Sequence, residues 1–407
     1  MRTRINLIWI ILLVLTGAFS LLYLWYAIFP GEVDARILQY FSMEQAVQGR
    51  EYQRALQVAS VISVILQIGF LTWFIFSGRA AKLSQRAQQI TAPRYWPGIL
   101  LFSVILWFML SLMILPFSLF GSFYWQKRWG FSAQSMSGWW LDYFKGAGIE
   151  LILFAAGIVL LFVMIKKWPK DWWLAVSGLF SLWLIVQSFL WPVVISPLYN
   201  SFVPAQDPAV IAMVRELSEK AQVPVGQILV MDASRRTTKA NAYFSGLGTT
   251  KRIVLYDTLL RDYPPDEVKA VVAHEMAHWQ QGHILKGLGW GIAGSFFVWG
   301  IIYVLVTLTV ARAQRDRPHV LAVIMLGILL VSYLGSPIEN NISRKMEEEA
   351  DRIAVSLTGD RPAAIRLQVD LAAKNLSELS PAGFIEWFSY SHPSVLSRID
   401  ILERAPE

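Results

Sequence analysis

The sequence predicts a mainly α-helical, polytopic membrane protein that crosses the bilayer seven times and carries a smaller α+β portion outside it. Three observations support this fold class. Apolar residues make up 55% of the 407 residues, charged residues make up only 16%, and there are 18 Trp. Soluble domains are about a quarter charged, so long stretches of this chain must lack charge. Seven long apolar runs account for this low charge, because five contain no charged residue and two contain one each. A helix needs about 20 apolar residues to cross the hydrocarbon core.

The predicted spans fall into two groups. The first group holds Asn6–Phe29, Val58–Gly78, Gly98–Gly121, Ile149–Ile165 and Trp172–Ile195, and the second holds Ile284–Val310 and Val320–Ser336. We read the first run as a retained span, because it is too long for the core of a signal peptide and lacks a clear small-x-small cleavage site. The prediction is therefore a five-span membrane domain over residues 1–197. A second domain covers 198–407, and two spans interrupt it at about 284–336.

The non-membrane parts show short strand and helix signals. Stretches typical of strands, Gln227–Met231 and Arg252–Tyr256, flank the segment Ala240–Leu247. A helix-like run follows Asp207-Pro208 and reaches Lys220. The segment Pro264–Glu267 indicates another helix start, with proline in the first turn and acidic residues near the positive end of the helix dipole.

Charge and cysteine content narrow the chemistry. The formal net charge is +7, and the basic residues cluster between the apolar runs. This placement suits lipid headgroups, so we expect the bilayer as a partner and no nucleic acid. The chain has no cysteine, which excludes thiol catalysis and disulfides.

The run His274-Glu275-Met276-Ala277-His278 carries the strongest functional signal. Residues four apart share one face of a helix, so both imidazoles can bind one metal ion. Glu275 lies beside the first histidine, where it can act as the base that activates water. The alternative is a chance pattern on an amphipathic helix. Because the whole chain holds five histidines, we favour a catalytic zinc site.

Catalytic zinc takes three protein ligands and leaves one position open. His283 follows His278 by five residues, which turns it away from the shared face. We therefore predict Glu347 as the third ligand, beyond the last two spans. Asp351 lies four residues later on the same face and can accept the hydrogen bond that a zinc-bound histidine usually donates. Without the histidine motif, this acidic stretch would be read as a solvated helix surface.

These motifs resemble those of the type I CAAX prenyl proteases, a family of integral-membrane zinc metallopeptidases also called a-factor-converting enzymes. The likeness extends over nearly the whole chain. It rests on His274–His278 with His283, on Ser343-Arg344 with Glu347 and Ala350-Asp351, on Ile195–Asn200, on Asn241–Gly246, and on Gly130-Phe131-Ser132. The resemblance implies seven helices around a water-filled chamber, with a zincin-like α+β metalloprotease domain closing one end.

The resemblance also implies roles that the residues alone do not indicate. His392 and Arg398 match a histidine and an arginine that are thought to bind the oxyanion in this family. Asn241 and Ala242 match an edge segment that pairs with extended substrate. The implied partners are one Zn²⁺ per chain and a peptide or protein substrate prenylated at its C-terminus. We expect a monomer.

Two signals disagree on which side of the membrane the zinc domain lies. The N-terminus, with Arg2 and Arg4, and the even-numbered loops are richer in Lys and Arg than the short odd-numbered loops. The positive-inside rule then places the zinc domain outside the cytosol. The family resemblance implies the cytosolic side, and our prediction follows it.

Two other functions remain open. One is a membrane quality-control zinc protease with no prenyl requirement, although such proteases have fewer spans. The other is a binding or transport protein with a dead metal site, in which Gln67 and Gln187 would mark a path through the membrane. The complete set of ligands and base argues against the second, and such glutamines more often join helices to one another. His319, in a short basic loop, is expected to be solvated.

Overall fold

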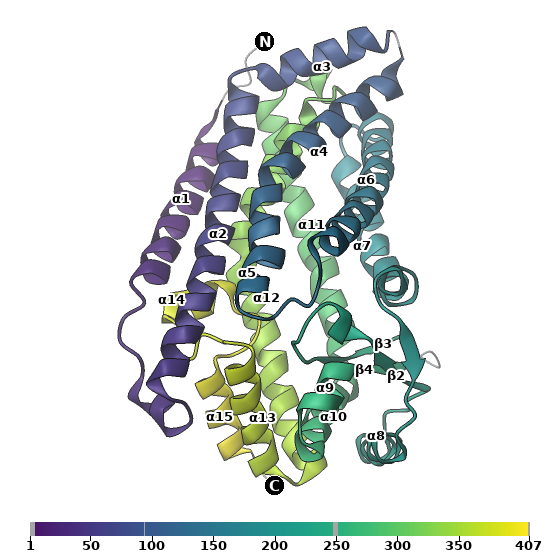
Figure 1. The fold of residues 1–407 in the computed structure, drawn as a ribbon. Coiled ribbons are helices and arrows are strands. Elements are labelled where there is room, and N and C mark those ends of the chain that lie inside the picture. The colour runs from purple at the N-terminus through teal and green to yellow at the C-terminus, as the bar shows by residue number, and fades with distance from the viewer. Residues whose placement is uncertain (1–4, 93, 247–250, 406–407) are drawn as a thin grey trace.

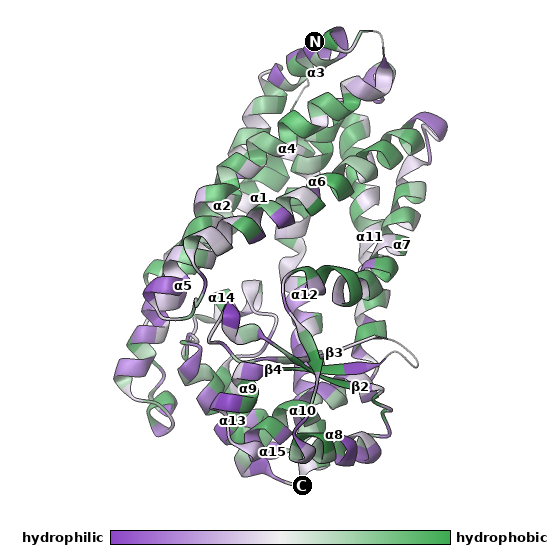
Figure 2. Ribbon diagram, turned by 45° about the vertical axis from the view of Figure 1, so that its right-hand side comes forward, coloured by the Kyte–Doolittle hydropathy of each residue, from purple (hydrophilic) through white to green (hydrophobic). Residues whose placement is uncertain are grey.

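The chain is elongated, with long helices at one end and a mixed helix and sheet domain at the other (Figure 1). This computed structural model describes residues 5–92, 94–246 and 251–405. Arg2, Arg4 and Leu247, which entered the sequence predictions, lie outside the described residues. Hydrophobic residues dominate the long helices and hydrophilic residues gather in the mixed domain (Figure 2).

Seven helices in the described chain are long and apolar enough to cross a membrane, as the sequence predicts. They are α1 (Leu7–Ile28), α2 (Met43–Phe76), α4 (Tyr95–Leu119, which continues through a π-helical turn into α5, Trp125–Arg128), α6 (Met136–Lys167), α7 (Trp172–Leu190), α11 (His283–Thr309) and α12 (Val320–Thr358). The protein is therefore an integral, multi-pass membrane protein.

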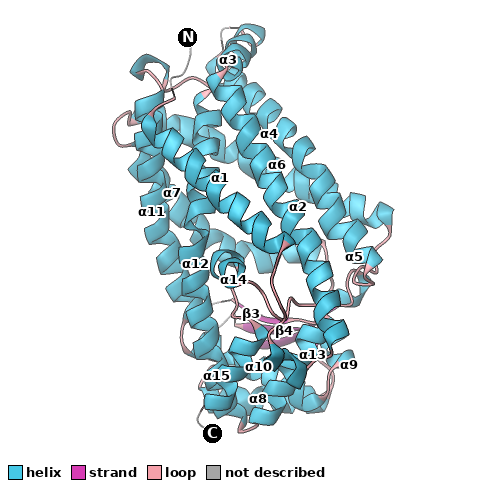
Figure 3. Cartoon of the chain, turned by 90° about the vertical axis from the view of Figure 1, so that its left-hand side faces the viewer, coloured by secondary structure: helices cyan, strands magenta, loops and turns pink. Residues whose placement is uncertain are grey.

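The seven helices form a closed ring. Neighbours contact one another in the order α1, α2, α4, α6, α7, α11, α12, and α12 returns to α1 and also contacts α2. Figure 3 shows the long helices rising from the end of the molecule that holds the sheet. On α7, Phe180 is 40% exposed and Leu182 is 56% exposed. Residues two apart on a helix point about 200° apart, so α7 is uncovered on opposite faces. One face can meet lipid, and the other faces the inside of the ring. This agrees with the chamber that the family resemblance implies.

Several helices extend beyond their predicted spans. The predicted span Val58–Gly78 begins 15 residues after α2 begins at Met43, and the short fourth span lies within α6. The prediction also ended the seventh span at Ser336, but α12 continues through Pro337 to Thr358 without a break. Hydropathy reports how much of a helix lies in hydrocarbon, and it does not report where the helix ends.

The mixed domain is built on a four-stranded sheet with the order β1-β2-β4-β3. β1 (Phe202–Pro204) pairs antiparallel with β2 (Gln227–Met231), β2 pairs parallel with β4 (Arg252–Tyr256), and β4 pairs antiparallel with β3 (Ala242–Ser245). β2 and β4 have the predicted bounds. β3 is an edge strand, and it contacts helix α10 (Pro265–Gln280).

Shorter helices complete the chain. They are α3 (Arg79–Ile90), α8 (Pro208–Ala221), α9 (Asp257–Asp262), α13 (Arg361–Lys374), α14 (Gly383–Ser389) and α15 (Val395–Arg404). The starts of α8 and α10 confirm the two helix starts predicted from Asp207-Pro208 and Pro264–Glu267. α12 joins the two ends of the molecule, because its first half packs among the spanning helices and its second half packs against α10.

The structure contradicts the prediction for His319 and gives Gln67 a partner within its own helix. His319 is only 6% exposed, because it caps the start of α12 and is covered there, and its burial lowers its pKa to about 4. Gln67 does not join two helices through its amide nitrogen. That nitrogen donates to the carbonyl oxygen of Ser63 in its own helix at 3.1 Å.

Candidate metal centre and peptidase site

Helix α10 brings the two histidines of the motif to one point. It begins with Pro265 at its first position and with Asp266 and Glu267 in its first turn, which favour a helix start. The helix is packed into the domain by four buried side chains that lie beside the histidines, those of Val272, Ala273, Met276 and Ala277. The Nε2 atoms of His274 and His278 then lie 3.1 Å apart.

Glu347 reaches the same point from α12. Its Oε2 lies 3.2 Å from Nε2 of His274, and its Oε1 lies 3.3 Å from Nε2 of His278. Three residues from two segments, separated by two membrane spans, therefore present their ligand atoms to one point. Glu347 is the residue that the sequence analysis predicts as the third ligand.

The donor set fits a metal ion. Zinc bonds to imidazole nitrogen and carboxylate oxygen at about 2.0–2.2 Å, so two ligand atoms of a tetrahedral site lie about 3.3–3.6 Å apart. The three separations here, 3.1, 3.2 and 3.3 Å, are close to that spacing. Glu347 is only 7% exposed, and its Oε2 accepts no hydrogen bond from the protein. A buried carboxylate oxygen that accepts no hydrogen bond from the protein is well suited to bind a cation.

Glu275 lies next to the first histidine and faces the same cavity. Burial raises the pKa of Glu275 to about 7, and the Glu347 carboxylate adds to this rise, while His274 and a hydrogen bond from the backbone of Phe244 oppose it. A carboxylate with a pKa near neutrality can both take and return a proton at physiological pH. The backbone contact also ties Glu275 to the edge strand β3.

Asp351 and Arg398 hold the outer side of His274. Asp351 is 2% exposed, and its Oδ1 lies 2.9 Å from Nδ1 of His274. Arg398 donates to both Asp351 oxygens, from Nε at 2.8 Å and from Nη2 at 2.6 Å. A guanidinium that binds a carboxylate through two parallel bonds fixes its orientation. The structure thus places Arg398 behind the site and places Asp351 between Arg398 and His274.

His392 lies on the loop between α14 and α15. Its Nε2 is 3.5 Å from Oε1 of Glu347, its side chain is 59% exposed, and its Nδ1 lies 3.0 Å from Oγ of Ser391. Arg344 of α12 holds this loop through Nη1, which donates to the carbonyl oxygens of Glu386 at 2.9 Å and Tyr390 at 2.6 Å. The helix that carries Glu347 therefore also positions His392.

Asn241 and Ala242 lie at the start of β3. The carbonyl oxygen of Asn241 accepts from the backbone nitrogen of Tyr256 on β4 at 3.0 Å. In antiparallel pairing the backbone groups of successive residues point to opposite edges, so those of Ala242 point away from β4. Asn241 Oδ1 accepts from the nitrogen of Ala242 at 2.9 Å. The carbonyl oxygen of Ala242 faces the free edge.

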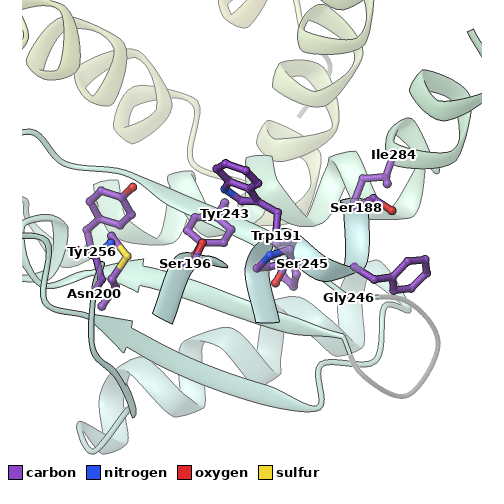
Figure 4. A pocket seen from close by; sticks show the side chains of 13 residues that line it. Ser188, Trp191, Ser196, Asn200, Tyr243, Ser245, Gly246, Tyr256 and Ile284 are labelled. Atoms are coloured by element: carbon purple, nitrogen blue, oxygen red, sulfur yellow. The ribbon is translucent and has the colours of Figure 1, made fainter. Parts of the chain in front are cut away.

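Two cavities meet at these residues. One, of about 140 Å³, has His274, Glu275, Glu347 and Asp351 in its wall. The other, of about 660 Å³, extends toward α2. They share Asn241, His392 and Arg398 in their walls. A third pocket of about 330 Å³ lies along β3, where the side chains of Tyr243 and Ser245 meet the end of α7 (Figure 4). Space for an extended chain is therefore present along the edge strand.

Sequence reasoning missed the contacts that two residues make beside the site. His283 Nδ1 lies 2.8 Å from His278 Nδ1, and His283 Nε2 lies 3.0 Å from Oε2 of Glu349. Lys239, two residues before Asn241, donates to the Tyr52 hydroxyl on α2 at 3.0 Å. The spacing predicted that His283 points away from the metal, and no periodicity could show what it contacts instead.

A ring of membrane helices that carries a base beside a histidine, histidine and glutamate cluster defines a class, the membrane metallopeptidases. Residues 204–405 match peptidase family M48, and residues 30–201 match the five membrane helices of the CAAX prenyl protease N-terminal family.

Similar proteins agree with these matches. An uncharacterised metalloprotease of Bacillus subtilis, YhfN, is 30% identical over 96% of this chain and 95% of its own length. CAAX prenyl protease 1 of Saccharomyces cerevisiae is 30% identical over 73% of this chain and 70% of its own. The crystal structure of Ste24p from S. mikatae superposes with a TM-score of 0.83 at 25% identity and covers 96% of both chains.

The chain belongs to peptidase family M48, within the CAAX prenyl protease family. It is a metalloprotease of the membrane, and its substrates are peptides.

Proposed function

We propose that the chain is a zinc endopeptidase in which His274, His278 and Glu347 hold one Zn²⁺. The observation that carries this proposal is the convergence of three ligand atoms from two separate segments beside the carboxylate of Glu275. When bound, zinc supplies a Lewis acid for peptide-bond hydrolysis. Side chains of the protein carry out the proton transfers and bind the oxyanion.

Glu275 is the general base in this proposal. Its carboxylate takes a proton from the attacking water and returns it to the leaving amine. The raised pKa of Glu275 supports both steps at neutral pH. His392 lines the same cavity and can donate from its ring nitrogen to the oxyanion. Arg398 lines the same cavity and contributes its positive charge there, while its bonds to Asp351 keep His274 in place.

The substrate lies along β3 as an added strand. Edge strands bind extended peptides through backbone hydrogen bonds, and the carbonyl oxygen of Ala242 is placed for such a bond. Asn241 then holds the start of the strand. The cavities at both ends of β3 support this path.

We propose a peptide prenylated at its C-terminus as the substrate, because relatives in yeast, plants and animals bear the name CAAX prenyl protease. The test compares one peptide in prenylated and unprenylated forms, incubated with purified protein and mapped by mass spectrometry. Cleavage of the prenylated form, stopped by a chelator and restored by zinc, supports the proposal. Equal cleavage of both forms would instead indicate a protease without a prenyl requirement. Cleavage that survives metal removal would contradict the zinc mechanism.

We place the zinc domain on the cytosolic side, following the family resemblance against the loop charges. The absence of cysteine makes a direct test simple. Ser356 is exposed on α12, and the variant Ser356→Cys adds a single thiol there. A membrane-impermeant maleimide should label this thiol only after the cells are permeabilised. Labelling in intact cells would reverse the orientation.

A further inference from the structure

His283 is a buried histidine to which the proposed reaction gives no task. It is 5% exposed and begins α11, directly after the turn that ends α10. Gly282 in that turn has a φ of +65°, a left-handed conformation that glycine adopts without strain. The turn brings the ring of His283 back against the ring of His278, with the ring centroids 4.9 Å apart.

The contacts of His283 form a continuous series from α12 to the site. Oε2 of Glu349 lies 3.0 Å from Nε2 of His283, and Nδ1 of His283 lies 2.8 Å from Nδ1 of His278. Lys286 lies 3.7 Å from Glu349 and keeps a positive charge beside that carboxylate. The series of contacts ends at Nε2 of His278, which lies 3.3 Å from Oε1 of Glu347.

The donors and acceptors in this series of contacts can be assigned from Glu349, whose carboxylate can only accept. The Glu349 carboxylate accepts, so Nε2 of His283 carries the hydrogen. The other nitrogen of a neutral imidazole is an acceptor, so Nδ1 of His283 accepts and Nδ1 of His278 donates. His278 then keeps a lone pair on Nε2, the atom that points to Glu347. The opposite tautomer of His278 would place a hydrogen where the metal must bind.

We propose that His283 and Glu349 form a relay that sets the tautomer and the ring orientation of His278 and so positions it as a zinc ligand. The inference rests on the proposed zinc site. It gives the two ligand histidines equivalent support from α12: Asp351 contacts His274 directly, and Glu349 contacts His278 through His283. Partners of this kind raise metal affinity by about 10- to 100-fold.

Zinc affinity tests the relay without any reference to activity. The purified full chain is measured by competition with a chromophoric chelator, as wild type and as Glu349→Ala, His283→Ala and the double variant. We expect Glu349→Ala and His283→Ala each to weaken zinc binding by about 10- to 100-fold. Because the two residues act in series, the double variant should bind zinc as weakly as His283→Ala alone.

Glu348→Ala is the matched control. Glu348 is the adjacent glutamate, and it lies 3.7 Å from Arg352 on the surface, so its loss should leave zinc affinity unchanged. If Glu349→Ala binds zinc as tightly as Glu348→Ala, the relay is wrong. If the double variant loses the sum of the two single effects, the series arrangement is also wrong.

Two further outcomes keep the test decisive. Glu349 is 44% exposed, so its alanine variant answers the question even where His283→Ala does not fold. A wild-type chain that binds no zinc would overturn the proposed function itself, whereas normal wild-type affinity with an unaffected Glu349→Ala overturns only the relay.

Discussion

Glu275 lies in an environment unlike that of an ordinary surface glutamate. Its carboxylate faces the cavity beside His274, and its pKa is raised to about 7 by burial. The amide of glutamine has nearly the same shape but cannot take a proton. The variant Glu275→Gln therefore separates proton transfer from metal binding.

We expect Glu275→Gln to lower kcat by about 10³-fold or more, because general-base catalysis contributes about 10²- to 10⁴-fold. Zinc content, measured by metal analysis of the purified protein, should equal that of wild type, since Glu275 is not one of the three converging ligands. A variant that cleaves peptide at the normal rate would contradict the role of Glu275 as base.

Residue spacing predicted much of the site, and its limits are physical. Helical periodicity places His274 with His278, and Glu347 with Asp351, because each pair is four residues apart on one helix. Glu349 lies about 200° round α12 from Glu347, so periodicity assigns it to solvent. Glu349 is linked to the site only through His283, which the turn at Gly282 brings against it. A contact made by a turn has no periodic signal in the sequence.

At the scale of single elements, α12 carries most of the arrangement. Within it, Glu347 reaches the metal centre and Asp351 contacts His274, while Arg344, one turn earlier, holds the loop that presents His392. A rigid helix therefore fixes the distance between the proposed metal and the proposed oxyanion donor.

The variant Arg344→Gln removes the hydrogen bonds to the carbonyl oxygens of Glu386 and Tyr390. We expect kcat to fall by about 10-fold, because a misplaced catalytic group slows the reaction. Zinc affinity should stay unchanged, because Arg344 is not one of the three converging ligands. In a His392→Ala background the same substitution should have no further effect on kcat. An equal loss in both backgrounds would show that Arg344 does not act through His392.

The junction between α2 and the C-terminal segment depends on a close approach at Gly49. A side-chain carbon at this position would overlap the carbonyl oxygen of Ser377, which is backbone and cannot move aside easily. Gly69 lies on the same helix, and nothing is within 4 Å of the place where its side-chain carbon would be.

We expect Gly49→Ala to destabilise the protein by about 2 kcal/mol, as overpacking at a fixed contact usually does. Gly69→Ala should leave stability equal or slightly higher, because alanine favours the helix. Thermal unfolding in detergent, followed by the loss of helical circular dichroism, measures both. A Gly49→Ala protein as stable as Gly69→Ala would show that the two segments do not meet closely.

At the scale of the whole molecule, hydropathy predicted the number of spans but not the lengths of the helices. The apolar part of α12 ends near Ser336, and the helix itself continues to Thr358. This continuation sets the spatial relation between the ring and the metal centre. A second link comes from Lys239, whose ammonium group lies 4.4 Å from the Phe131 ring and binds the Tyr52 hydroxyl just before the edge strand. Such links depend on tertiary contacts between distant segments, which no local pattern encodes.

The central claim is that imidazoles from α10 and a carboxylate from α12 bind one zinc ion in the domain at one end of the helix ring. Crystals of the full chain grown with zinc, with diffraction recorded on both sides of the zinc absorption edge, test it directly. We predict one anomalous peak per chain, about 2.0–2.2 Å from Nε2 of His274, Nε2 of His278 and a carboxylate oxygen of Glu347. A peak bound elsewhere, or density that leaves Glu347 unliganded beside a bound metal, would contradict the account.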